Sequence, residues 1–243
     1  MRFPGAVLSG LMTLLLMAGG CSLVEGETGG IESYAVKGRV TDSTGAPLAG
    51  VDVFAENTAE FGARVAGATD EEGLYELDLS GREPSSWRVT AQLSREYHGT
   101  KYTFALYPRE TAQFAGETGA IRDFEWKLSG ANPAGGVYGY TVYVYADVAD
   151  EDLDPSKVVL TFTPDGSLVD GSDGKSFSMV PKDGTTIPDV PVGRYTVTAA
   201  SSTDTGSGIR LRIPGKGDFS DKVTVDFVET EEHGIAMELE ISS

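Results

Sequence analysis

The sequence has few of the side chains that catalyse reactions or hold transition metals. It contains one cysteine, Cys21, and two histidines, His98 and His233, in 243 residues. A single cysteine allows no disulfide within the chain, so packing alone must hold the fold together. Two histidines far apart do not supply the three or four ligands that a zinc site needs, and no G-x-S-x-G nucleophile motif occurs. The sequence therefore predicts no catalytic residues, no metal site, no cofactor and no enzymatic activity.

Local sequence favours a structural interpretation of the remaining polar candidates. His98 and His233 each precede a glycine beside a strand pattern, which is typical of turn residues. The acidic run 150–154 has oxygen ligands at alternate positions, but Pro155 stands where an EF-hand loop needs glycine. We interpret this run as solvated turn residues and leave weak calcium binding open. The same interpretation applies to three further aspartates, Asp165, Asp170 and Asp173.

Positive charge is also scarce. The chain has 19 basic and 37 acidic residues, a net charge of −18. A surface of this sign repels polynucleotides and anionic lipid head groups. We therefore expect no nucleic-acid partner, and we interpret the acidity as that of a soluble, self-repelling extracellular surface.

Helical periodicity is hard to find, whereas glycine is abundant, with 31 residues. Apolar residues instead alternate at period two in short runs, which is typical of half-buried strands. Turn signals recur about every ten residues between these runs. This combination predicts an all-β fold made of sandwiches.

The stretch from Val36 to Leu79 shows the alternation most clearly. Turn signals at residues 42–45 and 69–73 separate its apolar runs, and Gly73 is expected to adopt a left-handed φ in the second turn. The pattern G-R-V-T-D-x-x-G-x-P-L-x-G-V-x-V, followed by T-D-x-x-G-x-Y-x-L, resembles a carboxypeptidase regulatory-like domain. The resemblance implies a seven-stranded transthyretin-like sandwich with an accessory role. It implies no peptidase activity, because the zinc ligands of a carboxypeptidase catalytic domain are absent.

The alternating runs fall into two sets of about seven strands on either side of a glycine-rich segment. Residues 31–129 are predicted to form the carboxypeptidase regulatory-like sandwich, residues 130–136 a linker, and residues 137–243 a second sandwich. Residues 189–197, D-V-P-V-G-R-Y-T-V, are similar to a turn and strand of the same superfamily, although the second half lacks the G-x-P-L-x-G-V opening. We interpret the halves as diverged copies of one transthyretin-like (prealbumin-like) architecture and leave the family of the second half open. Residues 107–122 lack alternation and predict a long loop, either a functional surface or a crossover between sheets.

The N-terminus resembles a bacterial lipoprotein signal peptide over residues 1–20. An apolar stretch, residues 6–17, is too short to span a bilayer of about 30 Å comfortably, and small residues lead directly into Cys21. The resemblance implies cleavage before Cys21 and diacylglycerol on its thiol, often with a third acyl chain, such as palmitate, on its amine. Residues 21–30 would then form a lipidated tether, since two or more acyl chains anchor a protein stably. We expect a membrane anchor on the extracytoplasmic side, at the plasma membrane or at an outer membrane where one exists; an ordinary secretory signal is the alternative.

One predicted strand, residues 137–146 (V-Y-G-Y-T-V-Y-V-Y-A), is apolar or aromatic on both faces. A sandwich strand has only one core face, so one face must cover something else. Tyr143 and Tyr145 share the face opposite Val142 and Val144. They are predicted either to bind a ligand such as a sugar, by ring stacking, or to pack against the other sandwich.

Two functional hypotheses remain open at this point. The first is a non-catalytic binding module for a surface polymer, either carbohydrate or protein, in the cell envelope. The second is a structural spacer or assembly subunit that holds one sandwich away from the membrane. An exposed aromatic groove would favour binding, whereas a covered tyrosine face and a smooth acidic exterior would favour a spacer.

Overall fold

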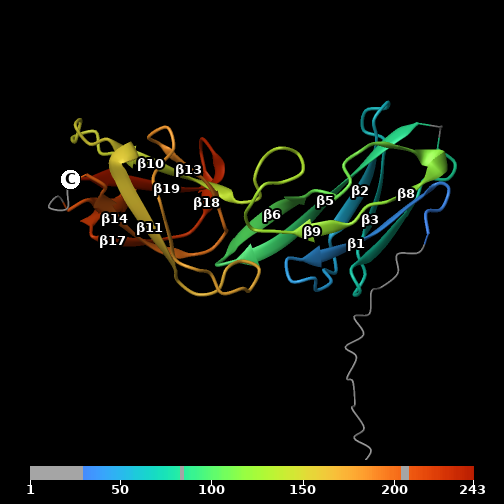
Figure 1. Cartoon of the computed structure of the whole chain (residues 1–243), viewed down its shortest axis with the longest axis horizontal. Helices are drawn as coiled ribbons and strands as arrows, with labels where there is room; N and C mark the ends of the chain where they lie inside the picture. The colour runs from blue at the N-terminus through green and yellow to red at the C-terminus, as the bar shows by residue number, and fades with distance from the viewer. Residues whose placement is uncertain (1–29, 83–84, 204–207) are drawn as a thin grey trace, which may run out of the picture.

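The computed structural model describes residues 30–82, 85–203 and 208–243. These residues form two β-sandwiches that lie end to end along the long axis of the molecule (Figure 1). The strands of the first sandwich lie between Ala35 and Trp126, and those of the second between Tyr140 and Ser242. The predicted signal peptide and Cys21 lie outside the described residues, and the linker boundaries at 130 and 136 stay a prediction.

The first sandwich has a four-stranded sheet facing a five-stranded sheet. In the smaller sheet the order is β4-β1-β8, and β9 also pairs with β1, in parallel. In the larger sheet the order is β3-β2-β5-β6, and β7 pairs with β5. The strands are β1 (Ala35–Asp42), β2 (Asp52–Asn57), β3 (Arg64–Ala68), β4 (Leu74–Asp78), β5 (Ser86–Tyr97), β6 (Thr100–Leu106), β7 (Phe114–Ala115), β8 (Ala120–Ile121) and β9 (Phe124–Trp126).

The turn chemistry of the first sandwich follows from its aspartates and glycines. Asp70 Oδ1 accepts hydrogen bonds from the backbone N–H groups of Glu72 and Leu74, at 3.1 and 2.7 Å. Gly73 has φ +73°, as predicted, and a Cβ there would lie 2.5 Å from the Val40 carbonyl oxygen. The hairpin therefore requires glycine both for its φ and for the close approach of β1.

The second sandwich has a six-stranded sheet facing a four-stranded sheet. The larger has the order β13-β10-β19-β15-β16, with β18 also on β19, and the smaller the order β12-β11-β14-β17. The strands are β10 (Tyr140–Ala146), β11 (Val158–Pro164), β12 (Phe177–Met179), β13 (Thr186–Val190), β14 (Tyr195–Ser201), β15 (Arg210–Ile213), β16 (Lys216–Ser220), β17 (Lys222–Val225), β18 (Val228–Thr230) and β19 (Gly234–Ser242).

Both sandwiches have the same strand topology. In each, the first strand pairs antiparallel with the fourth and parallel with the last, as β1 does with β4 and β9, and β10 with β13 and β19. In each, the opposite sheet places the third, second, fifth and sixth core strands side by side, as in β3-β2-β5-β6 and β12-β11-β14-β17. The second sandwich adds the β15–β16 hairpin before its sixth core strand. The prediction of an all-β fold with two tandem sandwiches is therefore confirmed.

Three strands of the second sandwich do not correspond to a predicted run: β13, β16 and β18. Strand β13 contains Pro188, which cannot donate a ladder hydrogen bond, and it lies at a sheet edge beside β10. Strands β16 and β18 are short and lack a buried stripe. Their positions depend on their neighbours, so alternation alone could not reveal them.

The long segment 107–122 crosses between the two sheets of the first sandwich. It carries β7, which pairs with β5 of one sheet, and β8, which pairs with β1 of the other. A short 3₁₀ turn, Gly116–Thr118, joins them. The crossover interpretation of this segment is therefore the one that the strand pairing supports.

Within the described part of the chain no helix has the length and apolar character needed to span a membrane.

Candidate ligand groove between the two sandwiches

The two sandwiches meet where the β5–β6 hairpin of the first reaches the loops of the second. His98 and Gly99 both have positive φ, 48° and 79°, and two such residues make the tight hairpin turn that suits a twisted strand pair. This turn carries Tyr97 and His98 to the second sandwich. There the Tyr97 hydroxyl donates to the Ser167 carbonyl oxygen at 2.8 Å and accepts from the Arg194 N–H at 3.1 Å.

Asp226 is the centre of a charged cluster on this side of the junction. Its carboxylate receives two-pronged hydrogen bonds from the Arg194 guanidinium, the shortest at 2.6 Å, which raise the pKa of Arg194. His98 Nδ1 lies 3.2 Å from the same carboxylate, and the His98 ring stacks on Tyr97 with centroids 4.1 Å apart. We call Tyr97, His98, Arg194 and Asp226 the clamp.

A buried tyrosine completes the joint. Tyr102 is 1% exposed, and its hydroxyl donates to the Phe227 carbonyl oxygen at 2.6 Å. Burial raises the pKa of Tyr102 to about 12, with a further contribution from the negative charge of Asp226. The ring of Tyr140 lies edge-on to three other rings, those of Tyr102, Phe104 and Phe227, with centroids 6.5, 5.9 and 5.8 Å away. These rings come from both sandwiches, so the joint is a small aromatic core of its own.

The segment between the sandwiches is also ordered by specific bonds. Asn132 Oδ1 accepts from the N–H groups of Ala134 and Gly136, both at 3.0 Å. Asp189 Oδ1 accepts from Gly130 N–H and Gly139 N–H at 2.9 and 3.0 Å. A Cβ at Gly139 would lie 2.5 Å from the backbone of Asp189, so glycine is what allows this close approach.

A groove of about 330 Å³ opens at the same junction. In the first sandwich its lining takes residues from β6 and the residues that directly follow β6 and β9. In the second it takes residues just before β10 and in its first half, the β18–β19 turn and the start of β19. The lining residues are Thr103, Phe104, Ala105, Tyr107, Lys127, Val137, Tyr138, Gly139, Tyr140, Thr141, Tyr143, His233, Ile235 and Ala236. We call this the junction groove.

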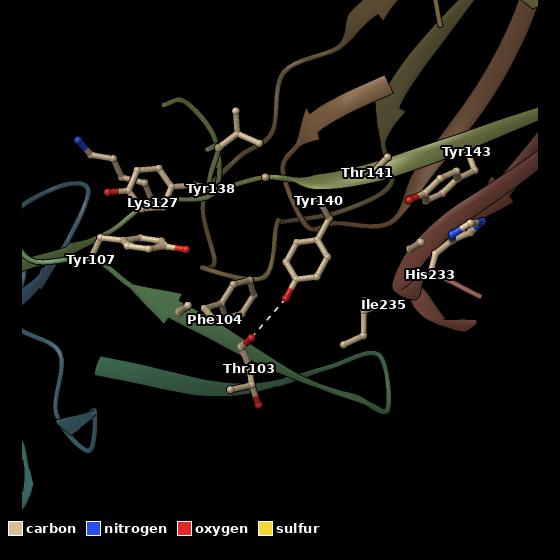
Figure 2. Close-up of a pocket in the computed structure, with 14 residues that line it drawn as sticks. Thr103, Phe104, Tyr107, Lys127, Tyr138, Tyr140, Thr141, Tyr143, His233 and Ile235 are labelled. Atoms are coloured by element: carbon tan, nitrogen blue, oxygen red, sulfur yellow. Dashed lines mark hydrogen bonds between the residues drawn. The ribbon is translucent and has the colours of Figure 1, made fainter. Parts of the chain in front are cut away.

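Two aromatic platforms stand at opposite ends of the junction groove. Figure 2 shows Tyr107 and Tyr138 beside Lys127 at one end, and Tyr143 beside His233 at the other, with Tyr140 between them. The rings of Tyr107 and Tyr138 meet edge to face, with centroids 6.0 Å apart, whereas Tyr143 and His233 stack almost parallel at 3.7 Å. The groove therefore offers ring faces and phenol hydroxyls along one path.

The phenol hydroxyls of this region remain neutral donors at ordinary pH. Burial raises the pKa of Tyr138, Tyr140 and Tyr145 above its usual value. The Tyr140 hydroxyl is 3.4 Å from the Thr103 carbonyl oxygen, the bond drawn in Figure 2. A neutral phenol can both donate to and accept from a ligand hydroxyl.

The structure separates the two tyrosines singled out from sequence. Tyr143 stacks on His233 and lines the junction groove, while the Tyr145 hydroxyl lies 3.0 Å from His233 Nε2 and its ring lines a different depression. Both are half-buried by the β18–β19 turn of their own sandwich. The ring contacts to the first sandwich come instead from Tyr138 and Tyr140.

Sequence reasoning missed most of the groove. Alternation puts Tyr138 and Tyr140 on the same face of their strand as Val142 and Val144, which are fully buried. The two tyrosines come before these valines and are only half-buried, and their rings contact the first sandwich. The other missed residues, Tyr107, Lys127 and His233, are far apart in sequence, and no local pattern connects them.

Each histidine ring has a partner within the protein. The His98 ring is paired with Asp226 and the His233 ring with Tyr145.

The acidic loops use their carboxylates to cap backbone groups. Asp150 accepts from Ser243, Asp154 from Ser156, and Asp170 from Ser172. No cluster of three or more histidine, cysteine, aspartate or glutamate side chains that could hold a metal ion occurs in the described ranges. The geometry of Asp154 and Asp170 is that of capped turns, whereas Asp150 holds a residue 93 positions further along the chain.

Comparison with known proteins yields no family for this chain. No family model matches the sequence, and no curated protein matches it. The resemblance to carboxypeptidase regulatory-like domains therefore stays a prediction from the sequence.

Solved structures with related architecture are distant. The Bacillus anthracis TIE protein is 14% identical with a TM-score of 0.36 over 86% of this chain, which spans 34% of that protein. A C-terminal fragment of the pilus adhesin SpaC from Lactobacillus rhamnosus GG is 10% identical with a TM-score of 0.29, covering 85% of this chain and 96% of the fragment. The minor pilin GBS52 of Streptococcus agalactiae is 12% identical with a TM-score of 0.25, covering 87% and 97%. Similarity at this level carries no functional assignment.

Proposed function

We propose that this protein is a non-catalytic binding module for a cell-surface polysaccharide, which it holds in the junction groove. The observation that carries the proposal is the pair of aromatic platforms, Tyr107 with Tyr138 and Tyr143 with His233, on one open groove. A sugar ring has apolar faces and a rim of hydroxyls. Stacking on an aromatic ring and hydrogen bonding to phenols recognise both features at once.

The dimensions and composition of the groove suit this role. Its volume of about 330 Å³ is near the lower end for ligand sites, which fits a short segment of a longer polymer. Its lining mixes aromatic rings with a few polar groups, among them Thr103 and Thr141. Because the groove lies between two sandwiches, its width depends on how they are joined.

The test is direct binding of polysaccharides to the purified full-length chain, by glycan array followed by calorimetry. At least one cell-envelope polysaccharide should bind, and Tyr107→Ala and Tyr143→Ala should each weaken binding by about 1 kcal/mol or more. Phe61→Ala is the matched control, since Phe61 is fully exposed in the β2–β3 connection and lines no part of the groove. Binding that survives both tyrosine substitutions, or the absence of any glycan ligand, contradicts the proposal.

The clamp favours a second function, that of a rigid spacer or assembly subunit. Four side chains and the buried Tyr102 hydroxyl tie the sandwiches together, and the ordered segment 130–136 adds further bonds. Such a joint fixes the angle between the sandwiches, so that the two move as one rigid unit. If no polymer binds, an envelope protein that docks on this rigid pair is the alternative ligand class.

Either function would be exercised from a membrane anchor at Cys21. We propose lipidation of Cys21 after removal of residues 1–20, with residues 21–30 as the tether. Cys21→Ala should release the protein from the membrane fraction or leave it unprocessed, as immunoblotting of fractions would show. A variant that is processed and fractionates as wild type contradicts lipidation.

A further inference from the structure

The charge of the junction groove differs from that of the rest of the protein. The chain carries 37 acidic residues, yet none of the residues that line the groove is an aspartate or a glutamate. The lining does contain Lys127 and His233, one at each platform. A neutral polymer would gain no binding energy from the lack of acidic residues or from Lys127 in the lining.

The surroundings of Lys127 leave an excess of positive charge. Its Nζ lies 3.2 Å from Glu125 Oε2, and Arg109 Nη2 lies 3.6 Å from the same oxygen. One carboxylate thus faces two cations. The Arg109 and Lys127 side chains are 69% and 42% exposed, while the Glu125 side chain is 24% exposed. The two cations therefore remain accessible to a ligand, whereas their carboxylate partner is the more covered group.

At the opposite platform, the contact between His233 and a carboxylate is longer than the contact between Lys127 and Glu125. His233 Nε2 lies 3.8 Å from Glu232, whose side chain is 82% exposed. Glu232 is not among the lining residues, and the His233 ring is held in the groove by Tyr143 and Tyr145. The end of the groove at Tyr107 and Tyr138 is the one that can pair with an anion, because Arg109 and Lys127 are exposed there, whereas Nε2 of His233 already has the Tyr145 hydroxyl as its partner.

We propose that the ligand of the junction groove is an acidic saccharide, one whose sugar units carry a carboxylate or a phosphate. This inference rests on the proposed function and names its ligand class. A sugar ring stacks on Tyr107 or Tyr138, and its anionic group pairs with Lys127, assisted by Arg109. Pairing with a charged donor strengthens the hydrogen bond and fixes the orientation of the ring.

The acidic remainder of the surface then contributes to selectivity. A polyanion that approaches elsewhere meets like charge, which disfavours contact. The junction groove combines ring faces with local positive charge, so an acidic polymer gains there what the acidic surface denies it. A neutral polymer would stack on the rings, but it would not pair with Lys127, and the acidic surface would not repel it from other positions.

The decisive experiment compares one polymer in two charge states. Polygalacturonate and the same polymer after reduction of its carboxylates to alcohols differ only in that group, and a phosphomannan provides the phosphate on a sugar unit as the other anionic source. We expect the full-length chain to bind polygalacturonate or the phosphomannan at least about tenfold more tightly than the reduced polymer. Lys127→Gln should remove most of this preference.

Matched variants distinguish polysaccharide binding in the groove from a preference for acidic polysaccharides. Lys175→Gln removes an equal charge from an exposed position outside the groove and should leave the preference unchanged. Equal affinity for charged and reduced polymers, with loss of both on Tyr107→Ala, overturns the acidic ligand while the proposed function stands. Failure of all three polymers to bind overturns both. Thermal unfolding of each variant establishes that it is folded.

Discussion

The clamp and the junction groove differ in whether their polar groups are paired within the protein. On the clamp side, each polar group already has a partner within the protein: Asp226 is shared by Arg194 and His98, and the Tyr97 hydroxyl has two partners. On the groove side, ring faces and the Lys127 side chain line an open depression. Polar groups that pair across the junction fix the angle between the two sandwiches. An open depression lined by ring faces leaves room for a ligand. The comparison shows how one interface can provide both rigidity and a site.

Tyr140→Ala is expected to have the largest effect, because Tyr140 belongs to both sides. Its ring contacts Tyr102, Phe104 and Phe227 and also lines the groove. Removing this half-buried ring should destabilise the joint by about 2–3 kcal/mol and abolish ligand binding. Chemical denaturation followed by tryptophan fluorescence, with small-angle scattering, measures both. A variant with wild-type stability and an unchanged radius of gyration would contradict the role of this ring in joining the sandwiches.

Tyr102→Phe tests the buried bond alone. The ring is kept, but the Phe227 carbonyl loses its partner, which should cost about 1–2 kcal/mol. Tyr75→Phe is the control within the first sandwich, because its hydroxyl donates to the Arg122 carbonyl at 2.6 Å. The control should destabilise the first sandwich without changing the relation between the two.

The same tyrosine predicts a dependence on alkaline pH. The pKa of Tyr102 is raised in the folded protein to about 12, so the folded state holds its phenol proton more firmly than the unfolded chain. The stabilisation is complete below about pH 10 and is lost as pH rises toward 12. The wild type should therefore lose more stability than Tyr102→Phe between pH 9 and about 11.5. Parallel loss in both proteins would exclude Tyr102 as the source.

Asp226→Asn tests the clamp with a small change in volume. The substitution keeps an oxygen acceptor but removes the charge that Arg194 and His98 share. We expect a wider distribution of angles between the sandwiches, measured by pulsed electron spin resonance between spin labels on the two sandwiches, and weaker ligand binding because the groove is held less firmly. Asp173→Asn, an exposed loop change outside the clamp, should change neither quantity.

Tyr143→Ala should have the smallest effect on structure. Its ring stacks on His233 of the same sandwich, so the radius of gyration should stay at the wild-type value and stability should change by about 1 kcal/mol or less. Binding should nevertheless weaken by about 1 kcal/mol or more. An increase in the radius of gyration would instead support the alternative that the Tyr143 face joins the two sandwiches.

Features that depend on nearby residues could be predicted from the sequence, whereas features that depend on distant strands could not. Alternation between buried and exposed positions is a local property of a strand, so β1, β2, β5 and β19 could be recognised from their stripes. Gly73 could be assigned a left-handed φ from the turn around it. Strand β13 was missed because Pro188 interrupts its pattern and because its place depends on the edge of β10.

The sequence by itself determined the strands that carry a buried stripe, the turns between them and the excess of aromatic side chains on residues 137–146, since each depends on neighbours a few positions away. Only the tertiary structure decided what those aromatics face. Tyr107, Tyr138 and His233 come together because the β5–β6 hairpin locks onto loops about 70 and 130 residues further along the chain. The angle of that contact, set by Asp226, Arg194 and the buried Tyr102, leaves one side of the junction open. No local pattern encodes an angle between two domains, because it results from contacts that exist only once both have folded.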